Sequence, residues 1–125
     1  MINIINRYKK LRIVIAHLLA PNPSLFDIWI DTLTNLKNEN VWFDIAALPW
    51  FISGESYPFS TTISFLAHAK NIVGAEHLIW GSDSPILLTI ATYEQLLEYV
   101  ITSNIFKNSE LEKVMCKNAE VVYKI

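Results

Sequence analysis

His77-Leu-Ile-Trp-Gly-Ser-Asp-Ser-Pro85 is an apolar run that leads directly into a glycine, a carboxylate and a proline. Leu78, Ile79 and Trp80 are typical of a short strand that is covered on both faces. Asp83 follows this predicted strand at its carboxyl end, where ligands and catalytic groups collect in parallel α/β architectures. An aspartate before a proline also commonly closes a turn, so this stretch alone leaves a purely structural role open.

Strand-like and helix-like segments alternate along the rest of the chain. Apolar runs at residues 13–17 and 41–45 predict two further buried strands. Helical spacing of apolar residues predicts helices over 24–36, 61–73, 92–103 and from 109 onward. The order predicts an α/β fold of three β-α units with a helical tail, in a single domain over residues 1–125.

The expected helix starts rest on short capping patterns. A serine or threonine followed three residues later by an acid or amide satisfies free backbone N–H groups at a helix N-terminus. Such pairs are Ser24 with Asp27, Thr92 with Gln95, and Ser109 with Glu112. Residues 49–60 contain proline, glycine and serine and are expected to form a loop that is longer than usual.

Composition limits the classes of partner. The chain has 125 residues, 52% of them hydrophobic, with a net charge of −2, an isoelectric point near 5.9 and a mean hydropathy of +0.29. Without a basic stripe, neither nucleic acid nor a membrane surface is an expected partner, and no apolar stretch approaches the roughly 18 residues of a membrane span. The single cysteine, Cys116, is expected to pack in a helix and fits a reducing, cytoplasmic location.

Three polar side chains fall at or near the ends of the predicted strands. His17 ends the first, Asp44 lies in the second and Asp83 follows the third. Because the carboxyl ends of parallel strands meet at one edge of a sheet, we expect His17 and Asp83 to converge there. A histidine and an aspartate can share a metal or transfer protons, although His17 alone also fits a satisfied core histidine. Asp44 could hydrogen-bond the backbone at the strand end or support a ligand through another residue, and the supporting role is favoured.

Other histidines and aromatic residues carry weaker signals. His68 and His77 lie away from the expected edge and are interpreted as structural or surface groups. Aromatic side chains gather between residues 42 and 59, and most are expected in the core, while the segment 50–59 is placed to cover a pocket. Trp50 and Trp80 are the candidate substrate-binding residues.

The combination of these segments resembles a known family. Ile13-Val-Ile-Ala-His17, Val41-Trp-Phe-Asp44, Leu78 to Pro85 and Asn118-Ala119 together look like the C-terminal part of the amidohydrolase-related metal-dependent hydrolases. That family includes the aminocarboxymuconate-semialdehyde decarboxylase-like enzymes. The resemblance covers nearly the whole chain, and it implies that the three strands correspond to strands six, seven and eight of a TIM-type (β/α)8 barrel.

The resemblance also implies site roles. His17 resembles the sixth-strand histidine that contacts substrate or metal-bound water, and Asp83 resembles the eighth-strand aspartate that binds the metal or acts on its water. The implied cofactor is a divalent metal, zinc or alternatively manganese. The implied reaction is hydrolysis of a C–N or C–O bond, or decarboxylation, of a small carboxylate-bearing substrate.

The match is incomplete in one informative respect. The family's first-strand His-x-His pair and its fifth-strand histidine have no counterpart in this sequence. A catalytic zinc ordinarily has three protein ligands, and a complete barrel typically needs about 250 residues. We therefore expect a truncated form with an incomplete barrel. Its unpaired strand edges favour a homo-oligomer, a monomer that is prone to aggregate, or association with a complementing chain.

Two functions of different classes remain open from the sequence. The chain is either part of a metal-dependent hydrolase or decarboxylase that needs its missing half, or a non-catalytic α/β remnant or binding module in which His17 and Asp83 are idle. An independent flavodoxin-like domain is less favoured, since it needs more strands and a glycine-rich phosphate loop, and the chain has only three glycines.

Overall fold

A computed structural model describes residues 1–52 and 54–125 of the chain. Its centre is a parallel three-stranded sheet in the order β1-β2-β3, with β1 at Ile13–Ile15, β2 at Val41–Asp44 and β3 at Leu78–Ile79. The register pairs Ile15 with Phe43 and Phe43 with Leu78. The prediction of an α/β fold with three parallel strands is confirmed.

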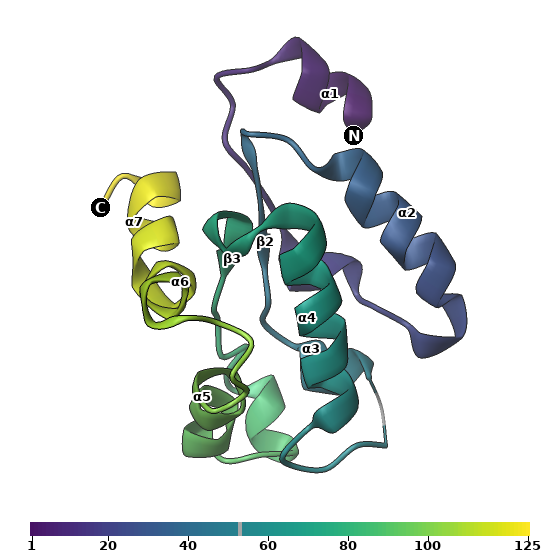
Figure 1. Cartoon of the computed structure of the whole chain (residues 1–125), viewed down its shortest axis with the longest axis vertical. Coiled ribbons are helices and arrows are strands. Elements are labelled where there is room, and N and C mark those ends of the chain that lie inside the picture. The colour runs from purple at the N-terminus through teal and green to yellow at the C-terminus, as the bar shows by residue number, and fades with distance from the viewer. Residues whose placement is uncertain (53) are drawn as a thin grey trace.

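Helices connect the strands and follow the last of them, as Figure 1 shows. The longer helices are α2 and α4, and a nearly continuous helical segment closes the chain. The helices are α1 (Ile2–Arg7), α2 (Phe26–Leu36), α3 (Leu48–Phe51), α4 (Ser60–Val73), α5 (Tyr93–Ile101), α6 (Asn108–Glu112), the π-helical turn η5 (Lys113–Lys117) and α7 (Asn118–Tyr123).

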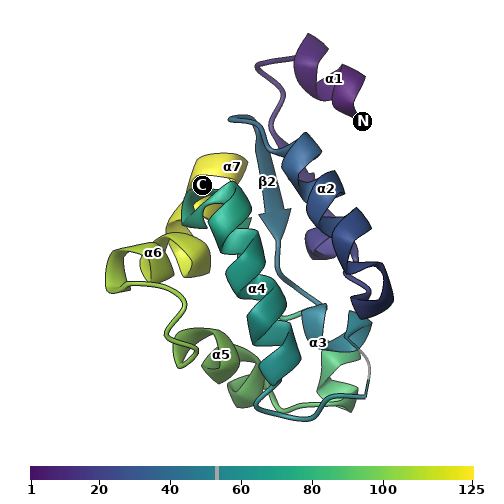
Figure 2. The same ribbon diagram turned by 45° about the vertical axis from the view of Figure 1, so that its right-hand side comes forward.

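Both faces of the sheet are covered by helices. Strand alternation places Phe43 and Leu78 in the main core with side chains of α2 and α4, including Leu33 and Leu66, and all four are fully buried. On the other face, Trp42 and Ile79 pack against Val122 of α7. In Figures 1 and 2, α2 and α4 lie on one side of the strands and α7 on the other. Double coverage explains why these strands are apolar throughout instead of alternating.

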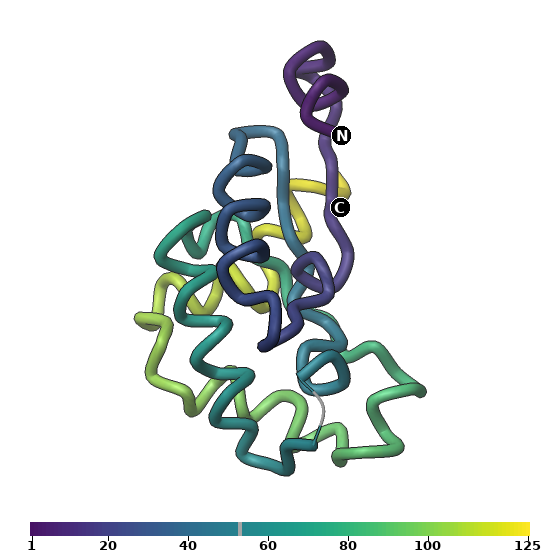
Figure 3. Tube along the Cα trace, turned by 90° about the vertical axis from the view of Figure 1, so that its right-hand side faces the viewer, coloured from purple at the N-terminus to yellow at the C-terminus, as the bar shows by residue number. Residues whose placement is uncertain are grey.

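The first helix lies at the end of this layered body and buries Ile5 in the main core. The tube in Figure 3 shows α1 projecting beyond the end of the sheet, joined by an extended segment. The buried Asn40 amide donates to the carbonyl oxygens of Tyr8 and Leu11 at 3.3 and 2.9 Å, and Arg12 donates to the Val121 carbonyl oxygen in α7. These contacts tie the start of the chain to the residue before β2 and to α7.

Several local predictions need correction at element ends. The first strand stops at Ile15, because the backbone enters the left-handed region at His17. The capping pair at Ser24 is wrong, since the Asn22 side chain accepts from the Ser24 N–H, and α6 starts with Glu110 bonded to the Lys107 N–H. The Thr92–Gln95 pair is confirmed as a reciprocal capping box.

Two other regions differ from the sequence interpretation. The segment expected to be a loop at 49–60 begins inside the short helix α3, which starts at Leu48. Cys116 is exposed instead of packed, and its thiol lies 3.4 Å from the Glu120 carboxylate. That hydrogen bond, followed by the negative charge of Glu120, raises the pKa of the Cys116 thiol. No helix in residues 1–52 and 54–125 is long and apolar enough to cross a membrane.

Candidate functional site

The carboxyl ends of all three strands meet at one edge of the sheet, and the candidate residues lie there. In Figure 2 the arrow of β2 points toward α3 at this edge. His17 follows β1, Asp44 is the last residue of β2, and Asp83 lies four positions after the end of β3. Since β2 is the central strand, Asp44 separates the other two along the edge.

His17 is held by the carboxylate of Asp44. The His17 backbone N–H donates to Asp44 Oδ1 at 2.8 Å, and the Ala46 N–H donates to the same oxygen at 3.2 Å. The imidazole Nδ1 of His17 lies 3.6 Å from that oxygen, beyond ordinary hydrogen-bond distance. The ring also packs against Phe51 of α3 with centroids 5.7 Å apart. Asp44 therefore makes backbone hydrogen bonds at the end of its strand, and its support of a functional group stays a prediction.

Asp83 lies in a separate part of the same edge. It is partly exposed and adopts a left-handed backbone conformation with φ of 51°, directly before the Ser84–Pro85 segment. Its carbonyl accepts from the Leu87 N–H at 3.3 Å, at the start of the turn η4 (Ile86–Thr89). Within the described residues, no hydrogen bond or ion pair joins the side chains of His17 and Asp83. Their joint role stays a prediction.

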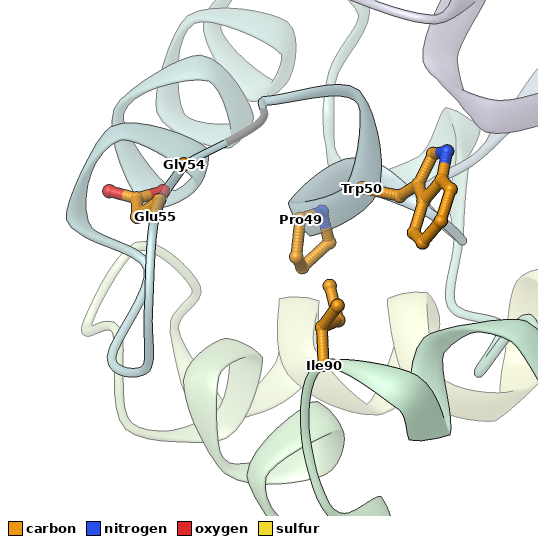
Figure 4. A pocket seen from close by; sticks show the side chains of 5 residues that line it. All are labelled: Pro49, Trp50, Gly54, Glu55 and Ile90. Carbon is orange, nitrogen blue, oxygen red and sulfur yellow. The ribbon is translucent and has the colours of Figure 1, made fainter.

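A pocket of about 350 Å³ opens beside α3. It is lined by Pro49, Trp50, Gly54, Glu55 and Ile90 (Figure 4). Figure 4 shows Pro49 and Ile90 facing each other, with Trp50 and Glu55 on opposite sides of them. Trp50 is half exposed. The sequence pointed to Trp50 but carried no signal for Ile90, which reaches the pocket only through tertiary folding.

Glu55 has a structural task next to this pocket. Its carboxylate accepts hydrogen bonds from the N–H groups of Thr61 and Thr62 and from the Thr62 hydroxyl, and so caps the N-terminus of α4. Partial burial alone acts to raise the pKa of Glu55, but the hydrogen bonds from Thr61 and Thr62 outweigh it and hold that pKa below its usual value. A negative charge therefore persists beside the pocket at neutral pH.

We expect Glu55→Gln to lower the free energy of unfolding by about 0.5–1 kcal/mol at pH 7, because a neutral amide caps less well. Since the folded-state pKa of Glu55 is lowered, its stabilising effect is complete above the unfolded pKa and disappears as pH falls through the folded pKa. Urea unfolding at pH 7 and below the folded pKa measures both effects. Glu39→Gln is the exposed control, and an equal loss at both pH values would contradict the capping role.

The remaining candidates have structural partners. Trp80 is partly buried, its indole N–H donates to the Leu96 carbonyl oxygen at 3.3 Å, and it is not among the five residues that line the pocket at Trp50. His77 Nδ1 lies 2.8 Å from the Val41 carbonyl oxygen. His68 is exposed and packs edge-on against Phe26. The interpretation of His68 and His77 as structural or surface groups agrees with these contacts.

The described residues do not by themselves fit a catalytic metal. Residues 1–52 and 54–125 contain no group of three His, Cys, Asp or Glu side chains that could hold an ion. A catalytic zinc site ordinarily needs three protein ligands and an open position. At this edge the Asp83 carboxylate and the His17 imidazole are the candidate ligands, and Asp44 Oδ1 already accepts from two backbone N–H groups.

Comparison with known proteins identifies the family. The amidohydrolase family model matches residues 1–125, which is the whole chain. A Burkholderia multivorans amidohydrolase crystallised with bound HEPES shares 20% identity, with a TM-score of 0.87 over 99% of this chain and 48% of that one. A second crystal form, with bound zinc, gives 19% identity, a TM-score of 0.86 and the same coverage.

Two more distant structures have the same fold. A Pseudomonas putida protein assigned as a 2-pyrone-4,6-dicarboxylic acid hydrolase shares 18% identity, with a TM-score of 0.76 over 99% of this chain and 48% of that one. The 5-carboxyvanillate decarboxylase of Sphingomonas paucimobilis shares 13%, with a TM-score of 0.65 over 98% of this chain and 36% of that one. No curated protein matches the sequence significantly.

The chain spans about half the length of the Burkholderia and Pseudomonas structures it matches. At these identities the structural likeness establishes the fold, whereas the family model covers the full sequence. The resemblance found in the sequence is confirmed: the chain belongs to the amidohydrolase family.

Proposed function

We propose that this chain is the C-terminal part of a metal-dependent amidohydrolase-type enzyme and carries strands six, seven and eight of its barrel. The observation that carries the proposal is the edge at which His17, Asp44 and Asp83 follow three consecutive parallel strands. This is the edge at which barrel enzymes place catalytic groups. The family membership and the likeness of the chain to about half of each neighbour support the same assignment.

In this proposal each residue has a stated task. Asp83 is the one metal ligand that the chain supplies and would also accept a proton from the water that the metal activates, and His17 contacts the substrate and moves protons. The other ligands come from polypeptide outside residues 1–125, in a longer chain or a partner, because the described residues hold too few donors. The bound metal, zinc or alternatively manganese, would polarise the substrate and activate water.

The proposed substrate is a small molecule that bears a carboxylate. The neighbours include the protein assigned to 2-pyrone-4,6-dicarboxylic acid hydrolysis and the 5-carboxyvanillate decarboxylase, so either C–O or C–N hydrolysis or loss of carbon dioxide fits the family. Trp50 is proposed to contact the flat part of the substrate beside Pro49 and Ile90. Trp80 is proposed as a second substrate contact through the part of its ring that stays accessible.

The unpaired edges of the small sheet affect how the protein is expected to associate. Strands β1 and β3 end the sheet of the described residues, and unpaired edges favour association with another chain. We propose that residues 1–125 form one domain that associates with a completing segment or, without it, with itself. The single, exposed cysteine is consistent with the cytoplasm as the proposed compartment.

Zinc stoichiometry tests the division of ligands. We expect the protein isolated under native conditions with its completing polypeptide to hold about one zinc per chain, and the 125-residue chain alone to retain almost none after dialysis. Elemental analysis and calorimetric titration measure both. A full equivalent bound tightly by the isolated chain would contradict the proposal that its ligands are incomplete.

Activity tests the reaction class. The native, zinc-loaded protein is assayed with 2-pyrone-4,6-dicarboxylate for ring opening and with 5-carboxyvanillate and 2,6-dihydroxybenzoate for decarboxylation, the last being the ligand of a further decarboxylase neighbour. We expect turnover of at least one compound to stop when a chelator removes the metal and to return with zinc. Turnover that is unaffected by complete metal removal would contradict a metal-dependent reaction.

A further inference from the structure

The segment after β1 has an unusual backbone. His17, Leu18, Leu19 and Ala20 all have positive φ, at 54°, 50°, 65° and 50°, and therefore form a left-handed turn without any glycine. For residues with a Cβ atom this conformation costs about 1–2 kcal/mol per residue. Such strain persists only where the surrounding structure holds it, and it concentrates at functional sites.

Three sets of contacts hold the turn. Asp44 Oδ1 accepts from the His17 N–H at its start, the Trp29 indole N–H donates to the Leu18 carbonyl oxygen at 2.8 Å, and the Ala20 N–H donates to the His17 carbonyl oxygen at 2.8 Å. Leu18 itself is completely buried. The bond to Asp44 involves an ionised acceptor and is the stronger kind.

The Nδ1 atom of the His17 imidazole is buried without a hydrogen-bond partner among the described residues. An atom in that state normally carries an energetic penalty. The Asp44 carboxylate is the acceptor next to it, at 3.6 Å, and a movement of about 0.7 Å would complete the bond. Apo sites often show such long contacts, which tighten when substrate binds.

We propose that Asp44 is the positioning residue of His17: its carboxylate holds the left-handed turn through the backbone and pairs with Nδ1–H, which leaves Nε2 as the nitrogen that exchanges protons with the substrate. The inference rests on the role proposed above for His17. Nδ1 is buried whereas the side chain as a whole is 36% exposed, so the accessible part of the ring is away from Nδ1.

This arrangement has a chemical consequence. A neutral histidine that donates from Nδ1 has its lone pair on Nε2, and the hydrogen bond at one nitrogen decides which tautomer is present. A proton accepted at Nε2 converts the ring to an imidazolium beside the Asp44 carboxylate, and the same atom returns that proton later in the cycle. One carboxylate thus sets both the direction of the ring and its protonation pattern.

Nitrogen-15 spectra of the full chain labelled in histidine test the inference directly. The His17 signals, assigned by their loss in His17→Gln, are expected to show the Nδ1–H tautomer above the pH at which the ring is charged. Asp44→Asn keeps an oxygen for the two backbone N–H groups but removes the charge, and is expected to reduce the population of that tautomer. Asp31→Asn, an exposed change on α2, is expected to leave it unchanged.

The kinetic expectation is a fall in kcat of about 10–100-fold for Asp44→Asn in the native enzyme with little change in KM. An Nε2–H tautomer in the unmodified chain overturns the inference, and this result does not depend on whether Asp44→Asn folds. Unchanged His17 spectra in Asp44→Asn also overturn it. If the tautomer responds to Asp44 but His17→Gln keeps full activity, the positioning contact stands and the proposed role of His17 fails.

Discussion

Asp83→Asn is expected to lower kcat of the native, metal-loaded enzyme by about 10²–10⁴-fold, the usual range for loss of a group that moves protons in the transition state. Asparagine has nearly the same shape, but it carries no negative charge and cannot accept a proton at neutral pH. The Asp83 side chain makes no hydrogen bond to a described residue, so the loss of its charge should change the stability of the fold little. Activity should therefore fall far more than stability.

The control for this variant is Asp31→Asn, which makes the same chemical change on the exposed surface of α2. Initial rates, zinc content and urea unfolding are measured for both proteins. Turnover and zinc content that match the unmodified enzyme would remove Asp83 from the mechanism. A loss of stability in proportion to the loss of activity would instead favour a structural role in the turn before Pro85.

The second large effect is expected at Asn118→Asp. The Asn118 side chain is buried at 6% exposure, and its amide donates to the carbonyl oxygens of Ala75 and Leu78, both at 2.7 Å. A carboxylate at this position has no hydrogen to donate and places negative charge against two carbonyl oxygens. The free energy of unfolding is expected to fall by about 2–5 kcal/mol.

Urea unfolding of the full chain at pH 7 measures this loss as a change in midpoint, with the slope showing whether the unfolding stays cooperative. Asn35→Asp is the matched control, because Asn35 is exposed near the end of α2 and should change stability by no more than about 1 kcal/mol. Equal effects of the two substitutions would show that the hydrogen bonds from Asn118 to Ala75 and Leu78 contribute little to stability.

The Asn118 contact also explains how the tail joins the sheet. Asn118 is the first residue of α7, and its side-chain amide contacts Ala75, before β3, and Leu78, at the start of β3. The backbone N–H of Trp80 also donates to the Val114 carbonyl oxygen at 2.9 Å. The two-residue strand β3 is therefore held by hydrogen bonds to the C-terminal helical segment as well as by its pairing with β2. The Asn118-Ala119 pair was part of the sequence resemblance, but its task required the structure.

Local signals were sufficient for much of the fold. The apolar runs predict β2 and β3, helical periodicity predicts α4, and the Thr92–Gln95 pair predicts the start of α5. These predictions succeed because each depends on residues within one or two turns of the chain. The predictions failed at Ser24, whose N–H donates to the Asn22 side chain, and at Ser109, where the observed cap joins the Lys107 N–H to the Glu110 carboxylate.

Strand periodicity and connection order are encoded locally, so the sequence alone determined the fold class and placed His17, Asp44 and Asp83 in or after three strands. The resemblance of its combined segments indicated the family, whereas the exact strand ends required the structure. Tertiary structure decided that the His17 backbone bonds to Asp44, that Ile90 joins Trp50 at one pocket, and that Trp80 turns its indole N–H to Leu96. These contacts join residues from 16 to about 40 positions apart. Their direction depends on the left-handed turn at 17–20 and on helix packing, neither of which a local pattern specifies.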